Sequence, residues 1–228
     1  MNRLLAIETS SEACSVALRI GSEMQEIHQH APLRHAELLL PAISRLLGDA
    51  GLAVADLDAI AFGRGPGSFT SLRIGIGVVQ GLAWAADIPV VPCSSLAAIA
   101  QQAADRAEGG SGHICVAVDA RMQEVFCAEF GPGPGGLVQP VGEERVCAPA
   151  AFGVSAPVDY LAAGNGFARY PDLQPLGQAA LACYDDLWPR ASVIARHALA
   201  WLADNAPLPA AQAQPVYIRN HVADKPKP

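Results

Sequence analysis

A glycine-rich loop constrains this chain more than any other feature. Residues 63–77 read GRGPGSFTSLRIGIG, between a short apolar strand pattern at 59–62 and an apolar helical pattern that ends near Ala86. Three glycines within five residues let the backbone take positive φ angles and approach other groups closely. Ser68 or Thr70 is placed to cap the helix that follows. Such a loop serves either as an anion cradle or as a docking corner for another protein.

Composition limits the classes of function. The 228 residues are long for one domain and sufficient for two, and 51% of them are hydrophobic. The formal net charge is −7 and no basic stripe appears, which argues against a free-standing tRNA or DNA binder. Six scattered cysteines without a CxxC pair are typical of reduced, buried thiols. With a short apolar N-terminal run and no run near the roughly 20 residues of a membrane span, we expect a cytoplasmic protein without membrane contact.

The apolar periodicity divides the chain into two halves, which we place at 1–108 and 109–228. In the first half we expect three consecutive strands, then alternating helices and strands. In the second half a flexible break at 109–112 precedes two strands, a further strand at 160–163 and a late helix. We expect the tail from 213 to return to the first half, with a disordered end. The predicted strands are 4–8, 14–20, 24–28, 59–62, 90–93, 114–119, 124–130 and 160–163, and the predicted helices are 35–50, 71–86, one from 94, and 191–203.

The two halves share a weak repeat of pattern. Glu8 and Asp119 each end the first strand of a half. Two strand-rich βββαβαβα units facing a cleft are typical of the actin/hexokinase/Hsp70 class, and here the second unit is degenerate. In that class, strand-ending acids hold a nucleotide and its metal. The alternative is that both acids cap turns by accepting backbone amide hydrogen bonds.

The common catalytic signatures are absent from the sequence. Ser68-Phe69 follows Gly67 where a P-loop requires Lys-Ser/Thr, and Pro66 and Thr70 replace the glycines of a nucleophile elbow. No two histidines stand four residues apart on a predicted helix, because the position four residues after His35 is Leu39. On a strand, His28 and His30 would share a face, which suits either a metal site or a solvated strand end. We predict no metal and no cofactor.

The two helices of the first half are too apolar for a solitary protein. The helix at 35–50 is apolar on more than one side, and the helix at 71–86 has no charge after Arg73. A helix that is apolar all round is normally buried, so we expect another chain to cover part of this surface. Glycines 75, 77 and 81 cost helix stability, and we expect close helix–helix approach to offset that cost.

Five motifs, in order, closely resemble the TsaB family. They are residues 5–18 (LAIETSSEACSVAL), 35–41 (HAELLLP), 65–75 (GPGSFTSLRIG), 118–126 (VDARMQEVF) and 215–219 (PVYIR), whereas 140–200 matches thinly. TsaB is the bacterial partner subunit in making threonylcarbamoyladenosine on tRNA, and it is related to TsaD, the transferring subunit. Two positions depart from the family pattern: Glu8 replaces the usual Asp, and Ser71 replaces an expected Gly.

The resemblance implies an actin-like, two-lobed fold and a non-catalytic scaffold that binds and activates a TsaD-type subunit. The modification lies next to the anticodon of tRNAs that read codons beginning with A. TsaD-like chains carry an HxxxH metal pair, of which only His35 remains here. The implied partners are a TsaD-type subunit, a TsaE-type ATPase in a larger complex, and a second copy when alone, with tRNA contacted only indirectly. A peptidase activity finds no support in the motifs.

We predict two groups of site residues and keep one alternative function. The predicted partner contacts are His35, Leu39, Ile43, Phe69, Leu72, Arg73 and Ile76. The predicted remnant of a nucleotide cleft comprises Glu8, Thr9, Ser10, Asp119, Arg121, Gly164 and Gly166. The alternative is an ATP-dependent enzyme of the sugar-kinase type that uses Glu8 and Asp119 in the cleft between the lobes.

Overall fold

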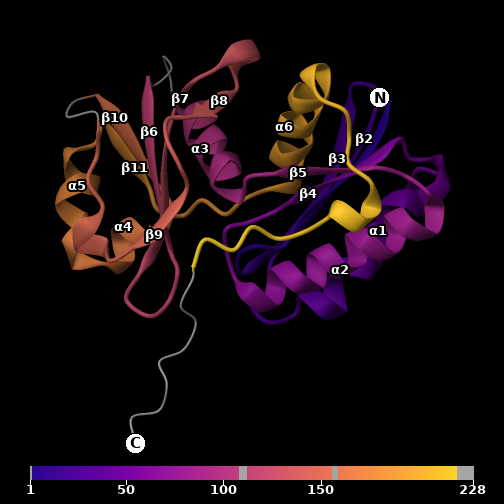
Figure 1. The fold of residues 1–228 in the computed structure, drawn as a ribbon, viewed down its shortest axis with the longest axis horizontal. Coiled ribbons are helices and arrows are strands. Elements are labelled where there is room, and N and C mark those ends of the chain that lie inside the picture. Colours follow the sequence, from indigo (N-terminus) through magenta and orange to yellow (C-terminus); the bar gives the residue numbers. More distant parts are fainter. Residues whose placement is uncertain (1, 108–111, 156–158, 220–228) are drawn as a thin grey trace, which may run out of the picture.

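The computed structural model describes residues 2–107, 112–155 and 159–219 and contains two mixed β-sheets side by side (Figure 1). The break expected at 109–112 lies largely outside these residues, and so does the end of the tail. The elements of the first half are β1 (Arg3–Glu8), β2 (Ala13–Ile20), β3 (Glu23–His30), α1 (His35–Asp49), β4 (Ala59–Gly63), α2 (Phe69–Ala86), β5 (Val90–Cys93) and α3 (Ser95–Arg106). Those of the second half are β6 (His113–Asp119), β7 (Val125–Pro132), β8 (Val138–Pro140), β9 (Arg145–Cys147), β10 (Tyr160–Ala163), α4 (Gly166–Arg169), α5 (Gln174–Ala179), β11 (Ala182–Tyr184) and α6 (Ala191–Asp204).

The two sheets have the same strand order, which explains the repeat of pattern in the sequence. The first sheet runs β3-β2-β1-β4-β5, with β1 antiparallel to β2 and parallel to β4. The second runs β8-β7-β6-β10-β11, with β6 antiparallel to β7 and parallel to β10, and a sixth strand, β9, also pairs with β7. Glu8 and Asp119 therefore end equivalent central strands. The second unit is degenerate in its helices, since only the four-residue α4, a 3₁₀ turn at Pro171–Leu173 and the six-residue α5 separate β10 from β11.

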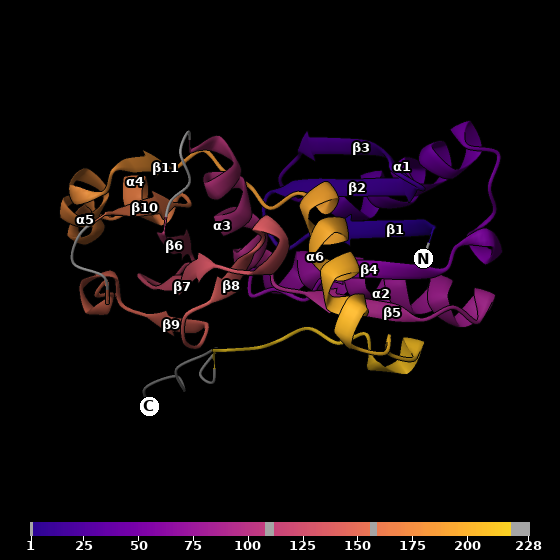
Figure 2. The same cartoon turned by 90° about the horizontal axis from the view of Figure 1, so that it is seen from above.

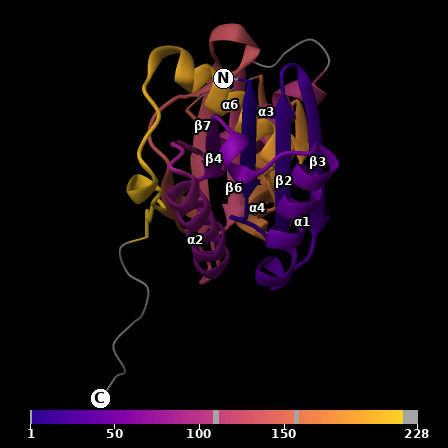
Figure 3. The ribbon, with the colours of Figure 1, turned by 90° about the vertical axis from the view of Figure 1, so that its right-hand side faces the viewer.

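Helices α1 and α2 lie side by side on one face of the first sheet (Figure 3). The stripe Leu39, Ile43 and Leu46 of α1 packs into the same core as Ile76 and Val79 of α2. Burying such apolar side chains contributes about 1.5–3 kcal/mol each. α1 begins at His35 and runs through Pro41.

The last helix of each half packs on the sheet of the other half. α3 follows β5 but contacts β6, β7, β8 and β10 of the second sheet. α6 follows β11 but crosses β1, β2 and β4 of the first sheet, opposite α1 and α2, as Figure 2 shows from above. α3 and α6 also contact each other. The chain thus returns to the first sheet at 191, well before the tail at 213. The boundary at 108/109 stays a prediction, and each half contains a helix that completes the other.

Four of the six cysteines are buried, as expected for structural thiols, whereas Cys147 is half-buried and Cys183 is exposed. Burial raises the pKa of the Cys93 thiol to about 12, which keeps it protonated and unreactive at neutral pH.

Two glycines of α2 provide a matched test of this packing. A Cβ atom on Gly75 would lie 2.1 Å from Thr9 Oγ1, whereas one on Gly77 would meet nothing within 4 Å. Gly75→Ala should therefore lower the free energy of unfolding by about 2 kcal/mol through overpacking. Gly77→Ala should raise it by up to about 1 kcal/mol, because Ala is the better helix former. Urea unfolding of both variants measures the difference, and equal effects would contradict the packing of Thr9 on α2.

Candidate functional site

The glycine loop cradles this chain's own β1–β2 turn. A Cβ atom on Gly63 would lie 1.9 Å from Glu8 Oε2, and one on Gly67 would lie 2.2 Å from the Ser10 carbonyl oxygen. The Ser68 backbone N–H donates to that same carbonyl at 2.7 Å. The glycines are therefore explained by close contact with residues 8–10, and the space a bound anion would need beside Gly63 and Gly67 is occupied by protein.

Ser68 occupies the N-cap position of α2 but does not cap the helix with its side chain. Its hydroxyl lies 3.0 Å from the Ser71 hydroxyl instead. The capping expected from the sequence is wrong at Ser68, because its backbone is fixed by Ser10 and its side chain pairs with the next turn. Ser94, by contrast, caps α3 by accepting a hydrogen bond from the Ala97 backbone N–H at 3.0 Å.

Glu8 is fully buried beneath the loop and is engaged by its neighbours. One carboxylate oxygen accepts the Ser10 backbone N–H at 2.6 Å, and the other accepts the Ser95 hydroxyl at 2.7 Å. Burial raises the pKa of Glu8, and the hydrogen bonds from Ser10 and Ser95 oppose that shift only in part. Glu8 is absent from the lining of the cleft between the lobes. The carboxylate closes a turn here, which is the turn-capping alternative of the sequence analysis.

Asp119 makes the equivalent turn in the second lobe and is still more heavily engaged. Its Oδ1 accepts the Arg121 backbone N–H at 2.8 Å and the Tyr170 hydroxyl at 2.6 Å. Its Oδ2 pairs with Arg121 at 3.2 Å and with Arg169 at 3.1 Å, and its side chain is 5% exposed. Two guanidinium groups of the chain therefore already pair with one oxygen of this carboxylate.

A cleft of about 710 Å³ separates the lobes. Of the predicted cleft residues, Ser10, Asp119 and Arg121 line it. Glu8, Thr9, Gly164 and Gly166 do not. Cβ atoms on Gly164 and Gly166 would lie 2.5 and 2.8 Å from the Ala117 carbonyl oxygen, so both glycines permit a tight turn against β6. The Arg121 side chain crosses the cleft to Glu12 at 2.9 Å and links the lobes.

Histidines 28, 30 and 35 do not converge on one point. His35 is buried, and its Nε2 lies 3.2 Å from the Ala13 carbonyl oxygen. His30 lies 3.4 Å from Glu12 and stacks on Trp188 with ring centroids 5.4 Å apart. Within the part of the chain that the structure describes, the cluster of metal-ligating side chains involves none of the three.

The predicted partner contacts divide by burial. Five of the seven are at most 5% exposed: Leu39, Ile43 and Ile76 pack in the core of the first lobe, and the buried His35 and Leu72 line the cleft. Only Phe69 and Arg73 are exposed, and the Arg73 guanidinium stacks 3.7 Å from the Phe69 ring centre. Whether any of the seven meets a partner stays a prediction. Other residues of α1 and α2, next to these positions in the sequence, form the outward side of the two helices.

The outward side of α1 and α2 combines apolar side chains and two exposed glycines of α2 with exposed polar residues of α1, which are Glu37, Ser44, Arg45 and Asp49. We call it the α1/α2 face. Trp84 is 75% exposed and Leu40 is 50% exposed. Cβ atoms on Gly77 and Gly81 would meet nothing within 4 Å, so neither glycine is explained by packing inside the chain. Its exposed apolar residues and glycines are Leu40, Phe69, Gly77, Gly81 and Trp84, whereas the half-buried Leu38, Ala42, Ile74, Val78 and Leu82 pack against the chain's own core.

By length and composition α2 could cross a membrane. Its 18 residues have a mean hydropathy of 1.2, yet only 33% of them are buried. The core helix of a soluble protein passes the same test of length and composition, so α2 does not overturn the expectation that no run spans a membrane. α2 packs against β4 and α1 through one side, so its apolar character exceeds what the inner side alone requires.

The tail contacts the first lobe, to which the sequence analysis expects it to return, and it also reaches the second lobe, which local sequence patterns did not indicate. The Val216 backbone N–H donates to the Arg64 carbonyl at 2.9 Å, and Arg73 Nε donates to the Tyr217 hydroxyl at 2.9 Å. Arg219 then reaches the second lobe, donating to the Ala120 carbonyl at 2.9 Å. In Figure 1 this segment runs in yellow from beside α2 toward β9.

Comparison with known proteins identifies the family. Residues 26–166 match the family model TsaD, tRNA N6-adenosine threonylcarbamoyltransferase. The tRNA threonylcarbamoyladenosine biosynthesis protein TsaB of Escherichia coli K12 is 35% identical over 229 residues, covering 99% of this chain and 98% of that protein. Its Haemophilus influenzae counterpart is also 35% identical, with 99% and 97% coverage. The chain belongs to the TsaB family.

A solved structure supports the same assignment. A Pseudomonas aeruginosa protein, described as uncharacterized with similarity to peptidase YEAZ, superposes with a TM-score of 0.88 at 40% identity. The match covers 96% of this chain and all of that one. With the repeated sheets, these relatives confirm the two-lobed actin-like fold and the TsaB resemblance read from the five motifs.

The buried Glu8 of this TsaB-family chain gives a pH prediction. Because its folded-state pKa is raised, the protonated form is favoured in the native state. That stabilisation is complete below the ordinary Glu pKa and is lost as pH rises through the raised value. Glu8→Gln mimics the protonated form, so its free energy of unfolding relative to wild type should rise with pH from about 4.5 and then level off. Urea unfolding across pH 4–8 checks this, and a flat difference would mean that Glu8 ionises freely.

Proposed function

We propose that this TsaB-family chain is a non-catalytic scaffold in forming threonylcarbamoyladenosine on tRNA, and that it binds and activates a TsaD-type subunit. Family membership supports the pathway, because the curated relatives are named as biosynthesis proteins for this modification. The α1/α2 face supports the scaffold role and is the observation that carries the proposal. The expected product lies next to the anticodon of tRNAs that read codons beginning with A.

The α1/α2 face has the composition of a helix-packing surface. Exposed Gly77 and Gly81 lie one turn apart and allow a second helix to approach the α2 backbone closely. Trp84 at one end and Leu40 on α1 supply large apolar side chains of the kind that anchor interfaces. Two helices from the partner would complete a bundle with α1 and α2. The family's own relationship to the TsaD model makes a TsaD-type chain, which carries the same fold, the proposed partner.

The state of the acids supports a role without catalysis. Asp119 is bound by Arg121, Arg169 and Tyr170, and Glu8 is buried under Gly63. A carboxylate that holds a nucleotide-bound metal requires free oxygen lone pairs facing the ligand. The net charge of −7 supports indirect contact with tRNA, mainly through the partner. A TsaE-type ATPase would join a larger complex, and a second copy would cover the α1/α2 face when the partner is missing.

Gly77→Arg tests the α1/α2 face without disturbing the core. The new side chain would enter open space in the free chain, where arginine is a good helix former, but would block a helix packed on α2. We expect affinity for the TsaD-type subunit from the same source to fall at least about 100-fold, or about 2.7 kcal/mol. Analytical ultracentrifugation of the mixture measures this.

The matched control is Ala200→Arg, on the exposed side of α6 across the first sheet. It adds the same side chain to another helix and should bind the partner like wild type. Wild-type affinity in Gly77→Arg would place the interface elsewhere. A stable homodimer that ignores the TsaD-type subunit would sink the scaffold proposal and leave a homodimeric binding module.

The sugar-kinase alternative makes a separate prediction. On the scaffold proposal, Asp119 only closes the 119–121 turn, so calorimetric titration of the isolated chain with Mg²⁺ and ATP should give no saturable binding. Asp119→Ala should then change stability alone, because Arg121, Arg169 and Tyr170 lose their shared acceptor. Micromolar ATP binding that disappears in Asp119→Ala would favour the enzyme.

A further inference from the structure

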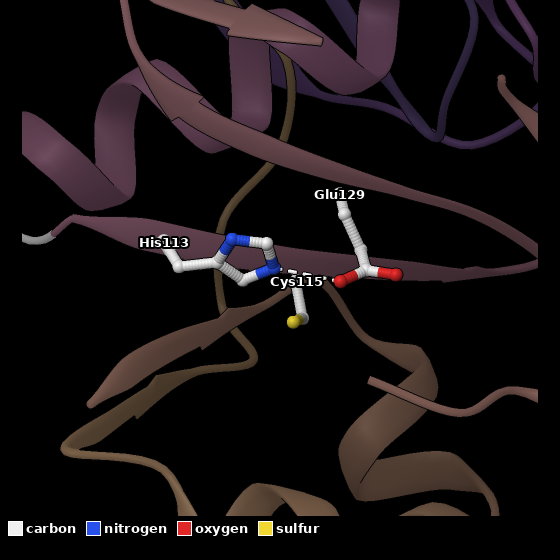
Figure 4. A group of neighbouring side chains, drawn as sticks. All are labelled: His113, Cys115 and Glu129. Carbon is white, nitrogen blue, oxygen red and sulfur yellow. Dashed lines mark hydrogen bonds and ion pairs between the residues drawn. The ribbon is translucent and has the colours of Figure 1, made fainter. Parts of the chain in front are cut away.

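Three side chains of metal-binding type converge on one face of the second sheet, at the end of β6 opposite Asp119. His113 and Cys115 are two residues apart on β6, so they share a face of the sheet. Glu129 on β7 pairs in register with Cys115 and therefore stands directly beside it. Figure 4 shows the three side chains pointing toward one another from these two strands. We call these three side chains, His113, Cys115 and Glu129, the tripod. Glu129 is 14 residues beyond Cys115 in the sequence, so only the pairing register of β6 and β7 brings the two together.

The spacing of the three groups suits a small ion. The histidine nitrogen, cysteine sulfur and carboxylate oxygen all lie within 4.8 Å of one another. His113 Nε2 and Glu129 Oε2 are 2.6 Å apart. Metal–ligand distances of about 2.0–2.3 Å place tetrahedral ligand atoms roughly 3.3–3.8 Å apart, so a modest opening of the His113–Glu129 pair would admit the ion.

The surroundings hold the ligands in place and exclude bulk water. The His113 and Glu129 side chains are only 15% and 11% exposed, and Cys115 is fully buried. Glu129 also accepts hydrogen bonds from the backbone N–H of Ser155, at 2.9 Å, and from its hydroxyl. Ligands oriented by neighbouring hydrogen bonds in this way are typical of protein metal sites. Among the residues that the structure describes, the Cys115 sulfur has no hydrogen-bond partner, which leaves it available to an ion.

We propose that His113, Cys115 and Glu129 form a binding site for a divalent transition-metal ion of the zinc class. One nitrogen, one sulfur and one oxygen donor suit Zn²⁺ and Co²⁺, whereas Mg²⁺ and Ca²⁺ prefer oxygen donors alone. The fourth position falls to water or to the Ser155 hydroxyl. The site goes beyond the scaffold function and lies on the other sheet from the α1/α2 face. A bound ion would join β6 to β7 and hold the segment at Ser155 against them.

The charge balance is favourable for a divalent cation. Hydrogen bonds from Ser155 and His113 lower the pKa of Glu129 despite its partial burial, so this ligand is a carboxylate at neutral pH. Binding releases the Cys115 proton to solvent. Burial and the nearby Glu129 raise the pKa of that thiol to about 12, and the charge of the ion offsets both effects in the complex.

Titration of the full-length, metal-free chain with Co²⁺ tests the site. Wild type should bind one equivalent with a thiolate-to-cobalt charge-transfer band, and Zn²⁺ should displace the cobalt and raise the melting temperature. Cys115→Ser should abolish the band. His113→Asn and Glu129→Gln should weaken binding at least about 100-fold, since even the loss of supporting groups costs 10–100-fold. The matched control is Cys183→Ser, whose exposed thiol lies outside the tripod and whose band should equal that of wild type.

Each result decides the proposal. Absence of the band in wild type, or its persistence in Cys115→Ser, would overturn the site. Because Cys115 is fully buried, its serine variant is compared with wild type by circular dichroism. If that variant does not fold, the partly exposed His113→Asn takes its place as the deciding variant, and wild-type cobalt affinity in it would refute the proposal. Binding of the TsaD-type subunit should be unchanged in these variants, so this site and the scaffold proposal fail independently.

Discussion

The exchange of closing helices between the halves holds the rest of the structure together. α6 packs its small side chains, among them Ala191 and Ala195, against Leu4 and Ala61 of the first sheet. α3 packs Leu96 and Ile99 against the second sheet, and the two helices touch. Because each sheet is covered by a helix from the other half, neither lobe can move far without exposing a core. Of these two helices α3 lines the cleft between the lobes, through Leu96 and Ile99.

The repeat persists in the strand order, whereas the acids that end its central strands now bind groups of the chain itself. Glu8 and Asp119 still end equivalent strands, and each accepts the amide two residues later. The space beside the glycines opposite them is occupied by the chain's own backbone and side chains. Buried acids that are satisfied internally specify turns. The repeat preserves the two sheets. α1 and α2 cover one face of the first sheet, and the proposed scaffold role uses the exposed side of these two helices.

Periodicity predicted β1–β7, β10 and the helices α1, α2, α3 and α6, because most of these strands are apolar and these helices carry a clear stripe, but it missed the short elements β8, β9, β11, α4 and α5. It failed where the outcome depends on distant residues. The stripe containing Leu39 and Ile43 indicated an apolar face but not which apolar face the sheet covers, and the sheet covers that one. The tail contact of Tyr217 with Arg73 spans 144 residues, and the tripod at His113 requires the β6–β7 register. No local pattern contains such information.

Gly75 and Gly77 have the same place in the sequence pattern of α2 but different surroundings in the structure. Both are helical glycines, two residues apart, and each weakens α2 relative to alanine by up to about 1 kcal/mol. Thr9 explains Gly75, whereas nothing among the described residues explains Gly77 or Gly81. On the scaffold proposal the explanation is a helix of the partner. α2 would then pack one side into the core of this chain and the other side against the partner. Two packed sides would account for the high mean hydropathy of a helix that is only one-third buried in the free chain.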